Sequence, residues 1–154
     1  MRNIFYLILL LSIFGCGGQP LPDGMPKLFE CNVKILSEGQ PLPDVTVEFC
    51  SSDPDFKWGT SATTDENGNA RMVTYGKYFG VPEGEYTVIV HKLQREEFDP
   101  ERPPRQVRLF TLTDPQYTSP KTTPLKITVN GKTAQEFDVG KTDATQVLRM
   151  EDAM

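Results

Sequence analysis

The side chains that can act as nucleophiles, general bases or soft metal ligands are scarce in this sequence. It contains three cysteines, Cys16, Cys31 and Cys50, and a single histidine, His91. A cysteine beside a histidine can perform nucleophilic catalysis, and three or four such side chains together can bind zinc. No local motif places His91 next to a cysteine, and one histidine falls short of the usual zinc ligand set when the cysteines are engaged otherwise. We expect no catalytic residues, no metal and no cofactor, with a hydrolase built on a Cys–His pair as the alternative.

Oxygen-bearing side chains offer a second chemistry, calcium binding. They stand at Asp53, Asp55, Asp65, Glu66 and Asn67. The run 65–68 lacks the alternating acidic spacing and the distal glutamate of an EF-hand loop. Its Asn67-Gly68 pair instead tolerates the positive φ of a tight turn, and the Asp65 side chain can cap such a turn. We expect a turn here, with a weak cation site as the alternative.

Aromatic side chains are the strongest candidates for ligand contact. Trp58, Tyr75 and Tyr78 stand near one another in the sequence. Exposed rings of this kind bind sugar rings or the side chains of a protein partner. The alternative is that the three rings cap one end of a thin hydrophobic core. Clustering on an exposed face would favour ligand contact, and burial would favour the core.

The first residues have the features of a secretory signal. Arg2 supplies a positive charge, Ile4 to Phe14 form an almost unbroken apolar run, and Gly15 is small enough for a cleavage site. A helix that crosses a bilayer needs about 20 apolar residues, so this run is too short for a stable span. We predict that residues 1–15 are a signal peptide.

The residue that follows Gly15 is Cys16, and Ile13-Phe14-Gly15-Cys16 resembles the lipobox of bacterial lipoproteins. In that family the cysteine receives a diacylglyceryl group, and the amine exposed by cleavage is often acylated. The resemblance implies lipidation of Cys16 and a membrane partner outside the cytoplasm. Gly17, rather than Asp, follows the cysteine, and in enterobacteria-like sorting this favours the outer membrane. The alternative is an ordinary secretory signal followed by a chance cysteine.

Cys31 and Cys50 form an even pair in an oxidising compartment, where disulfides persist. A disulfide between them would close a loop of about 20 residues, worth roughly 3 kcal/mol in the chain-entropy model. In a simple hairpin of 31–36 with 44–50, however, the alternation of side chains points the two cysteines to opposite faces. A bulge or a strand end at Cys50 would bring them together. Both a disulfide and two separate thiols therefore stay open.

The elements that position these residues are short strands. The chain has 154 residues with 13 prolines and 12 glycines, and 38% of its residues are apolar, which fits one thin domain rather than a large α/β enzyme. We expect a flexible tether at 16–28, then one domain at 29–150 with a long excursion at 92–123. Period-two alternation predicts strands at 31–35, 44–49, 58–63, 70–75, 85–90, 107–112, 124–129, 134–139 and 146–149.

No long segment after the signal has a helical period, so we predict an all-β fold, a seven-stranded antiparallel β-sandwich of the Ig-like or transthyretin-like kind. Several turns and strands resemble carboxypeptidase regulatory-like domains, whose fold is transthyretin-like or prealbumin-like. They are Gly39-Gln40-Pro41-Leu42-Pro43-Asp44, Val45-Thr46-Val47-Glu48-Phe49, Thr64-Asp65-Glu66-Asn67-Gly68 and Gly84-Glu85-Tyr86-Thr87-Val88. The stretch 117–129 also resembles small lipoproteins of planctomycete-type bacteria. The resemblance implies the fold, and it implies no activity.

The net charge of −5 disfavours one class of partner, nucleic acid, because phosphate binding relies on clustered Lys and Arg. The sequence therefore predicts a lipid-anchored, non-catalytic structural or interaction module outside the cytoplasm, whose partner is a protein or polysaccharide of the cell envelope. The alternative is a module that binds carbohydrate or envelope polymer through Trp58, Tyr75 and Tyr78.

Overall fold

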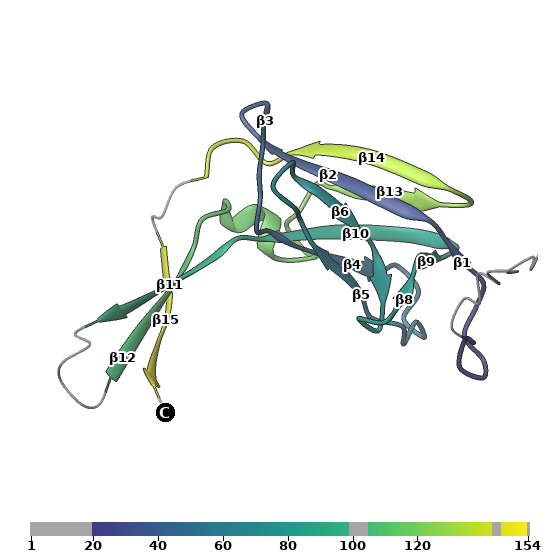
Figure 1. Ribbon diagram of the computed structural model, residues 1–154, viewed down its shortest axis with the longest axis horizontal. Helices are drawn as coiled ribbons and strands as arrows, with labels where there is room; N and C mark the ends of the chain where they lie inside the picture. The colour runs from purple at the N-terminus through teal and green to yellow at the C-terminus, as the bar shows by residue number, and fades with distance from the viewer. Residues whose placement is uncertain (1–19, 99–104, 143–145, 154) are drawn as a thin grey trace, which may run out of the picture.

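Alternating apolar and polar residues form two β-sheets that pack face to face in the computed structural model, which describes residues 20–98, 105–142 and 146–153 (Figure 1). The larger sheet consists, in spatial order, of Lys126–Val129 (β13), Gly84–His91 (β10), Thr46–Ser51 (β4), Thr60–Thr63 (β5), Val73–Thr74 (β7) and Tyr78–Phe79 (β8). The smaller sheet consists of Thr133–Asp138 (β14), Cys31–Ser37 (β2), Gln40–Pro41 (β3) and Asn69–Arg71 (β6).

The prediction of an all-β sandwich is confirmed, with two differences. The strands are shorter and more numerous than seven, since the sequence-predicted strand at 70–75 divides into β6 in one sheet and β7 in the other. In addition, β14 runs parallel to β2, with Thr133 opposite Cys31, so the sandwich is not wholly antiparallel. The predicted signal peptide and Cys16 lie outside the described residues.

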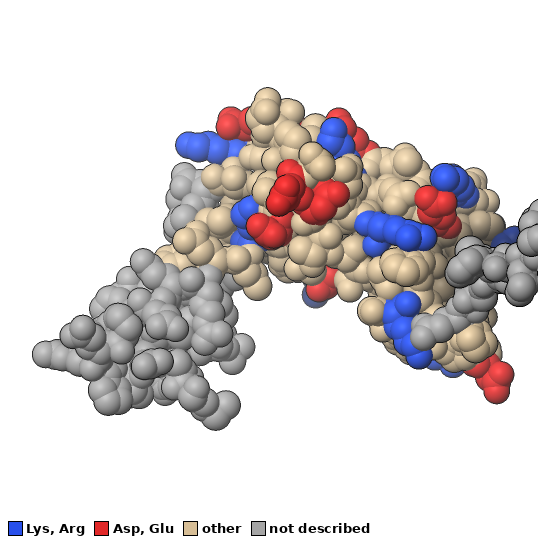
Figure 2. Space-filling view, in the orientation of Figure 1, with Lys and Arg blue, Asp and Glu red and all other residues tan. Residues whose placement is uncertain are grey.

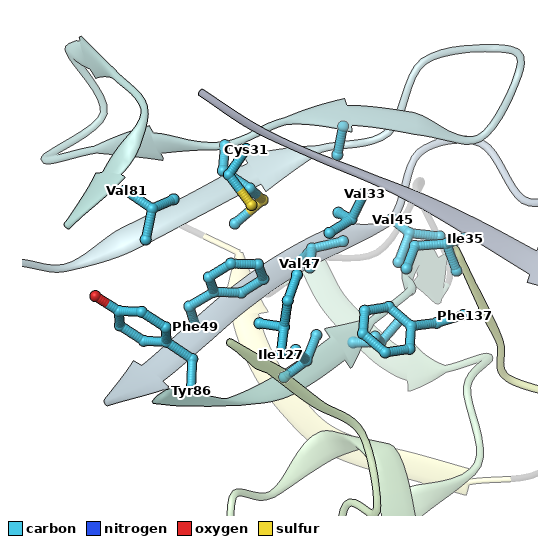
Figure 3. Close-up of a cluster of buried hydrophobic side chains, with 14 of the residues drawn as sticks. Cys31, Val33, Ile35, Val45, Val47, Phe49, Val81, Tyr86, Ile127 and Phe137 are labelled. Atoms are coloured by element: carbon cyan, nitrogen blue, oxygen red, sulfur yellow. The ribbon is translucent and has the colours of Figure 1, made fainter. Parts of the chain in front are cut away.

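The core lies between the two sheets and follows the predicted alternation. Val45, Val47 and Phe49 before and within β4 face Val33 and Ile35 of β2, and all of them are buried (Figure 3). Removing such side chains from water contributes about 25 cal/mol per Å² of apolar surface.

Tyr86 of β10 also points into the core. Its hydroxyl donates a hydrogen bond to the Pro82 carbonyl oxygen at 2.8 Å. Pro82 belongs to Val81–Pro82 (β9), which pairs with Leu28–Phe29 (β1) at the edge of the sandwich. The ring therefore packs as an apolar group while its one polar atom is satisfied.

The turn at 65–68 forms as predicted, but it joins the two sheets instead of two strands of one sheet. The Asp65 carboxylate accepts hydrogen bonds from the backbone N–H groups of Asn67 at 2.9 Å and Asn69 at 2.8 Å. Gly68 has φ +75°, and a Cβ at this position would lie 2.5 Å from the Ile35 carbonyl oxygen. Only glycine therefore allows the turn to close against β2.

The excursion at 92–123 contains more structure than the sequence indicated. Leu93–Phe98 (β11) continues from β10 and pairs with Arg105–Thr111 (β12), which also pairs with Gln146–Ala153 (β15). These strands form a three-stranded sheet that projects from one end of the sandwich (Figure 1). One strand was predicted in this region near 107–112, and β11 was missed because Leu93-Gln94-Arg95-Glu96-Glu97-Phe98 has no period-two apolar pattern. A short 3₁₀ turn, Pro115–Thr118 (η1), follows β12.

Thr64 is a buried polar residue that fastens the loop before β4. Its hydroxyl donates to the Leu42 carbonyl oxygen at 2.8 Å and accepts from the Val45 backbone N–H at 3.0 Å. Because these groups have no access to water, each would be left unsatisfied without the hydroxyl.

We predict that Thr64→Val, which keeps the shape of the side chain and removes the hydroxyl, lowers the free energy of unfolding by about 3 kcal/mol. The reason is that the substitution leaves two buried polar groups without a hydrogen-bond partner. Urea unfolding followed by circular dichroism measures this change. Thr63→Val, one residue earlier and exposed, is the matched control and should change stability by about 0.5 kcal/mol or less. Equal stability of the two variants would contradict this assignment.

Candidate functional site

Two shallow hollows meet on the outer face of the larger sheet, where β4 ends and β5 begins. We call them together the β4–β5 hollow. One is lined by Glu48, Phe49, Gly59, Thr60, Ser61, Tyr75 and Gly76. The other is lined by Phe49, Cys50, Ser51, Asp53, Phe56, Lys57, Trp58 and Gly59. Because Phe49 and Gly59 line both, the two hollows form one continuous surface.

The strand alternation explains why polar groups face this hollow. Val47 and Phe49 point into the core, so Glu48 and Cys50 of β4 point outward. Ser61, opposite Glu48 in the neighbouring strand β5, faces the same side. The floor of the hollow therefore presents a carboxylate, a thiol and a hydroxyl.

The loop 52–59, which forms one wall, is held by its own polar groups and by one ring. The Asp53 carboxylate accepts a hydrogen bond from the Asp55 backbone N–H at 2.9 Å, and the Ser51 hydroxyl oxygen accepts from the Asp53 N–H at 3.1 Å. The Phe56 ring packs edge-on against Tyr86, with ring centroids 5.6 Å apart. The acidic residues of this loop thus serve turn formation, and the aromatic contact fixes the loop to the core.

Tyr75 lies beside the end of this loop and is held there by several contacts. Its backbone has φ 55°, in a region that non-glycine residues rarely occupy and that costs about 1–3 kcal/mol. Its N–H donates to the Gly59 carbonyl oxygen at 2.8 Å, and its hydroxyl donates to the Lys57 carbonyl oxygen at 2.9 Å. The ring lies 5.4 Å from that of Trp58. These contacts hold Tyr75 in one orientation although 52% of its surface is exposed.

Two of the three predicted aromatic contact residues, Trp58 and Tyr75, line the hollow, and Tyr78 does not. Trp58 is 9% exposed and packs against the Tyr75 ring, with the Lys57 ammonium 5.5 Å from the Trp58 ring centroid. Tyr78 lies on β8 and lines neither part of the hollow; the Lys77 ammonium is 5.2 Å from its ring centroid. Sequence reasoning named Trp58 and Tyr75 but missed Glu48 and Ser61, whose outward parity was the available signal.

The cysteines and the histidine are not brought together. Cys50 of β4 lies opposite Thr87 of β10. His91 is four residues beyond Thr87 on β10, so it lies about 13 Å along the strand from the residue that faces Cys50. Cys31 is buried in the core on β2, in the other sheet. The arrangement offers no Cys–His pair within the described part of the chain.

Cys31 and Cys50 are both free thiols, so the candidate disulfide is not formed. The physical reason is that 31–37 and 46–51 do not form the hairpin that the sequence indicated. The strand β2 pairs with β14 and β6, whereas β4 pairs with β10 and β5. The Cys31 side chain faces the core and the Cys50 side chain faces outward, and no bulge in β4 changes this.

Burial raises the pKa of the Cys31 thiol to about 11. Burial and the neighbouring Glu48 carboxylate also raise the pKa of Cys50. Since the thiolate is the nucleophile, both shifts reduce reactivity near neutral pH.

Within residues 20–98, 105–142 and 146–153, no group of three metal-ligating side chains occurs. In the same part of the chain, no helix has the length and apolar character needed to span a membrane.

Comparison with known proteins is limited to distant structural likeness. No family model matches the sequence, and no curated protein matches it. Among solved structures, the chain is similar to a DUF3823 family protein from Parabacteroides merdae, with 14% identity, a TM-score of 0.37 and coverage of 77% of this chain and 47% of that one. It is also similar to a 9R-lipoxygenase from Cyanothece, with 17% identity, a TM-score of 0.37 and coverage of 79% and 18%. The chain thus spans less than half the length of either protein, and likeness at this level assigns it no activity.

We predict that iodoacetamide labels Cys50 slowly in the folded protein and labels Cys31 only after unfolding, because Cys31 is buried. Peptide mass spectrometry separates the two sites. The raised pKa of Cys50 means that less thiolate is present at pH 8 than for an ordinary cysteine, so its labelling rate should still climb as the pH increases beyond 8. Labelling of Cys31 as fast as Cys50 in the native state would contradict the two locations.

Proposed function

We propose that this chain is a lipid-anchored, non-catalytic interaction module outside the cytoplasm, and that the β4–β5 hollow is its contact surface. The observation that carries the proposal is Tyr75, whose backbone is strained and whose exposed ring is held in place by Trp58 and the loop 52–59. Strained, preorganised side chains concentrate at binding sites, because a fixed ring loses little entropy when a ligand stacks on it. The distance between His91 and the thiols supports a role without catalysis.

The anchor in this proposal rests on the first residues of the chain. The short apolar run, Gly15 and Cys16 have the order of a lipoprotein signal. Lipidation would hold the sandwich outside the cytoplasm, with the outer membrane favoured by Gly17. The turns that resemble carboxypeptidase regulatory-like domains support the same kind of module, since they build a scaffold and not an active site.

We predict that cells expressing the full chain incorporate radiolabelled palmitate into it, and that Cys16→Ala abolishes the label, because the thiol of Cys16 is the acceptor. Immunoprecipitation and autoradiography measure the incorporation. Cys50→Ala is the matched control and should keep the label. Label that persists in Cys16→Ala, or that is missing from the unaltered chain, would remove the anchor from the proposal.

Carbohydrate or another envelope polymer is the ligand class that one specific observation favours. The exposed Tyr75 ring borders an open hollow whose floor carries the Glu48 carboxylate and the Ser61 hydroxyl. Sugars are bound by this combination, in which a ring supports the apolar face of the sugar and nearby acceptors bind its hydroxyls. A protein of the envelope remains the other partner class.

We predict that Tyr75→Ala weakens binding to soluble peptidoglycan fragments or envelope polysaccharide about thirtyfold, the effect of a central aromatic contact worth about 2 kcal/mol. Isothermal titration calorimetry measures the affinity. Phe79→Ala removes another exposed ring that lies outside the hollow and should leave the affinity unchanged. Equal losses in the two variants would rule out a specific contact at Tyr75. Absence of binding to any polymer by the unaltered chain would leave a protein partner as the ligand class.

A further inference from the structure

A second surface lies on the edge of the sandwich where the chain enters it. We call it the β1–β8 patch and define it by Lys27, Phe29, Arg71, Lys77, Tyr78 and Phe79. The strand β1 pairs with β9, which follows β8 in the chain. At Gly80, between β8 and β9, the backbone lies so close to β1 that an added Cβ would be 2.7 Å from the Phe29 carbonyl oxygen. Residues near 28 and near 79 therefore belong to one surface.

A Lys or Arg side chain lies over each aromatic ring of this patch. The Arg71 guanidinium lies 4.0 Å from the Phe79 ring centroid, and the Lys27 ammonium lies 5.0 Å from that of Phe29. Lys77 is placed in the same way over Tyr78. Figure 2 shows Lys and Arg side chains, with Asp and Glu side chains among them, at the end of the molecule where Figure 1 places β1, β8 and β9.

The patch also exposes apolar surface. Phe79 has 62% of its surface exposed, and Leu21, in the segment that leads to β1, has 42%. Core packing does not account for these side chains, because neither belongs to the buried cluster. An aromatic ring paired with a cation matches the bilayer interface, where rings sit at headgroup level and cations meet phosphates.

The position of the proposed lipid anchor favours a bilayer as the partner of the β1–β8 patch. If Cys16 is lipidated, the segment from Gly17 to Lys27 can hold β1 no further than about 40 Å from the membrane, even when fully extended. The opposite end of β2 lies about 20 Å from β1 along the strand. The β1–β8 patch therefore lies at the end of the sandwich where the tether enters, and the tether allows it to reach the lipid.

Charge favours the same orientation. The chain as a whole has a net charge of −5 and would be repelled by an anionic surface unless it presented its cations. Two acidic residues of the entering segment lie near the patch in the chain: Asp23, which is exposed, and Glu30, which is paired with Lys132 at 3.0 Å. The three cations of the patch, Lys27, Arg71 and Lys77, still outnumber them.

We infer that the β1–β8 patch docks on the surface of a bilayer that contains anionic phospholipid, with Phe79 at headgroup depth and Arg71, Lys27 and Lys77 on the lipid phosphates. This inference rests on the proposed lipid anchor. Docking would set the orientation of the sandwich and would leave the β4–β5 hollow, on the outer face of the larger sheet, open to its ligand.

The test compares the lipidated protein in two kinds of nanodisc, one of phosphatidylcholine alone and one of equal parts phosphatidylcholine and phosphatidylglycerol. Hydrogen–deuterium exchange of the backbone amides at 76–80 is the readout, since docking shields them. We expect slower exchange in the anionic discs only. Lys77→Gln should reduce this slowing about fivefold, the effect of one basic side chain near an anionic surface. Phe79→Ala should reduce it as well.

Two control variants change exposed residues outside the β1–β8 patch. Lys121→Gln removes an exposed cation and Leu93→Ala removes an exposed apolar side chain, and both should keep the slowing. A protein that enters both discs and shows the same exchange in each would overturn the docking surface alone. A protein that enters neither disc would contradict the anchor at Cys16, and the docking surface would be lost with it.

Discussion

Val47 and Phe49 can face the core only if Glu48 and Cys50 face outward, because successive side chains of a strand point to opposite faces of the sheet. The same constraint acts on β10, where Tyr86, Val88 and Val90 are buried between the sheets. A slip of one residue in either strand would place all of these apolar groups in water. The composition of the β4–β5 hollow is therefore a direct consequence of how the core is packed.

The connections between the sheets depend on polar groups placed at single positions. Asp65 caps the turn that leads from β5 to β6, and Thr64 satisfies two buried backbone groups just before it. At the far end, the Asp138 carboxylate accepts hydrogen bonds from the backbone N–H groups of Glu38, Gly39 and Gly140, which lowers its pKa. These contacts join the end of β14 to the turn after β2 and thereby hold the parallel pair in register.

Both proposed surfaces lie at the end of the sandwich where the chain enters. The hairpin of β7 and β8 separates them, with Tyr75 facing the loop 52–59 and Phe79 facing β6 through Arg71. This division allows one edge to meet a membrane while the outer face of the larger sheet meets a ligand. The three-stranded extension of β11, β12 and β15 leaves from the opposite end and does not border either surface.

The sequence by itself determined which faces of the strands are buried, where the glycine turns occur and that Trp58, Tyr75 and Cys50 merit attention. Period-two alternation and turn chemistry are local properties, so they can be read from neighbouring residues. Only the tertiary structure decided that β2 pairs with β14 in parallel, that Cys31 and Cys50 lie in different sheets and that Tyr75 rests on Trp58 while Tyr78 does not. These outcomes depend on which strands become neighbours. Strand pairing is decided by how well side chains that are distant in the chain pack together, and a single sequence contains no local signal for that packing.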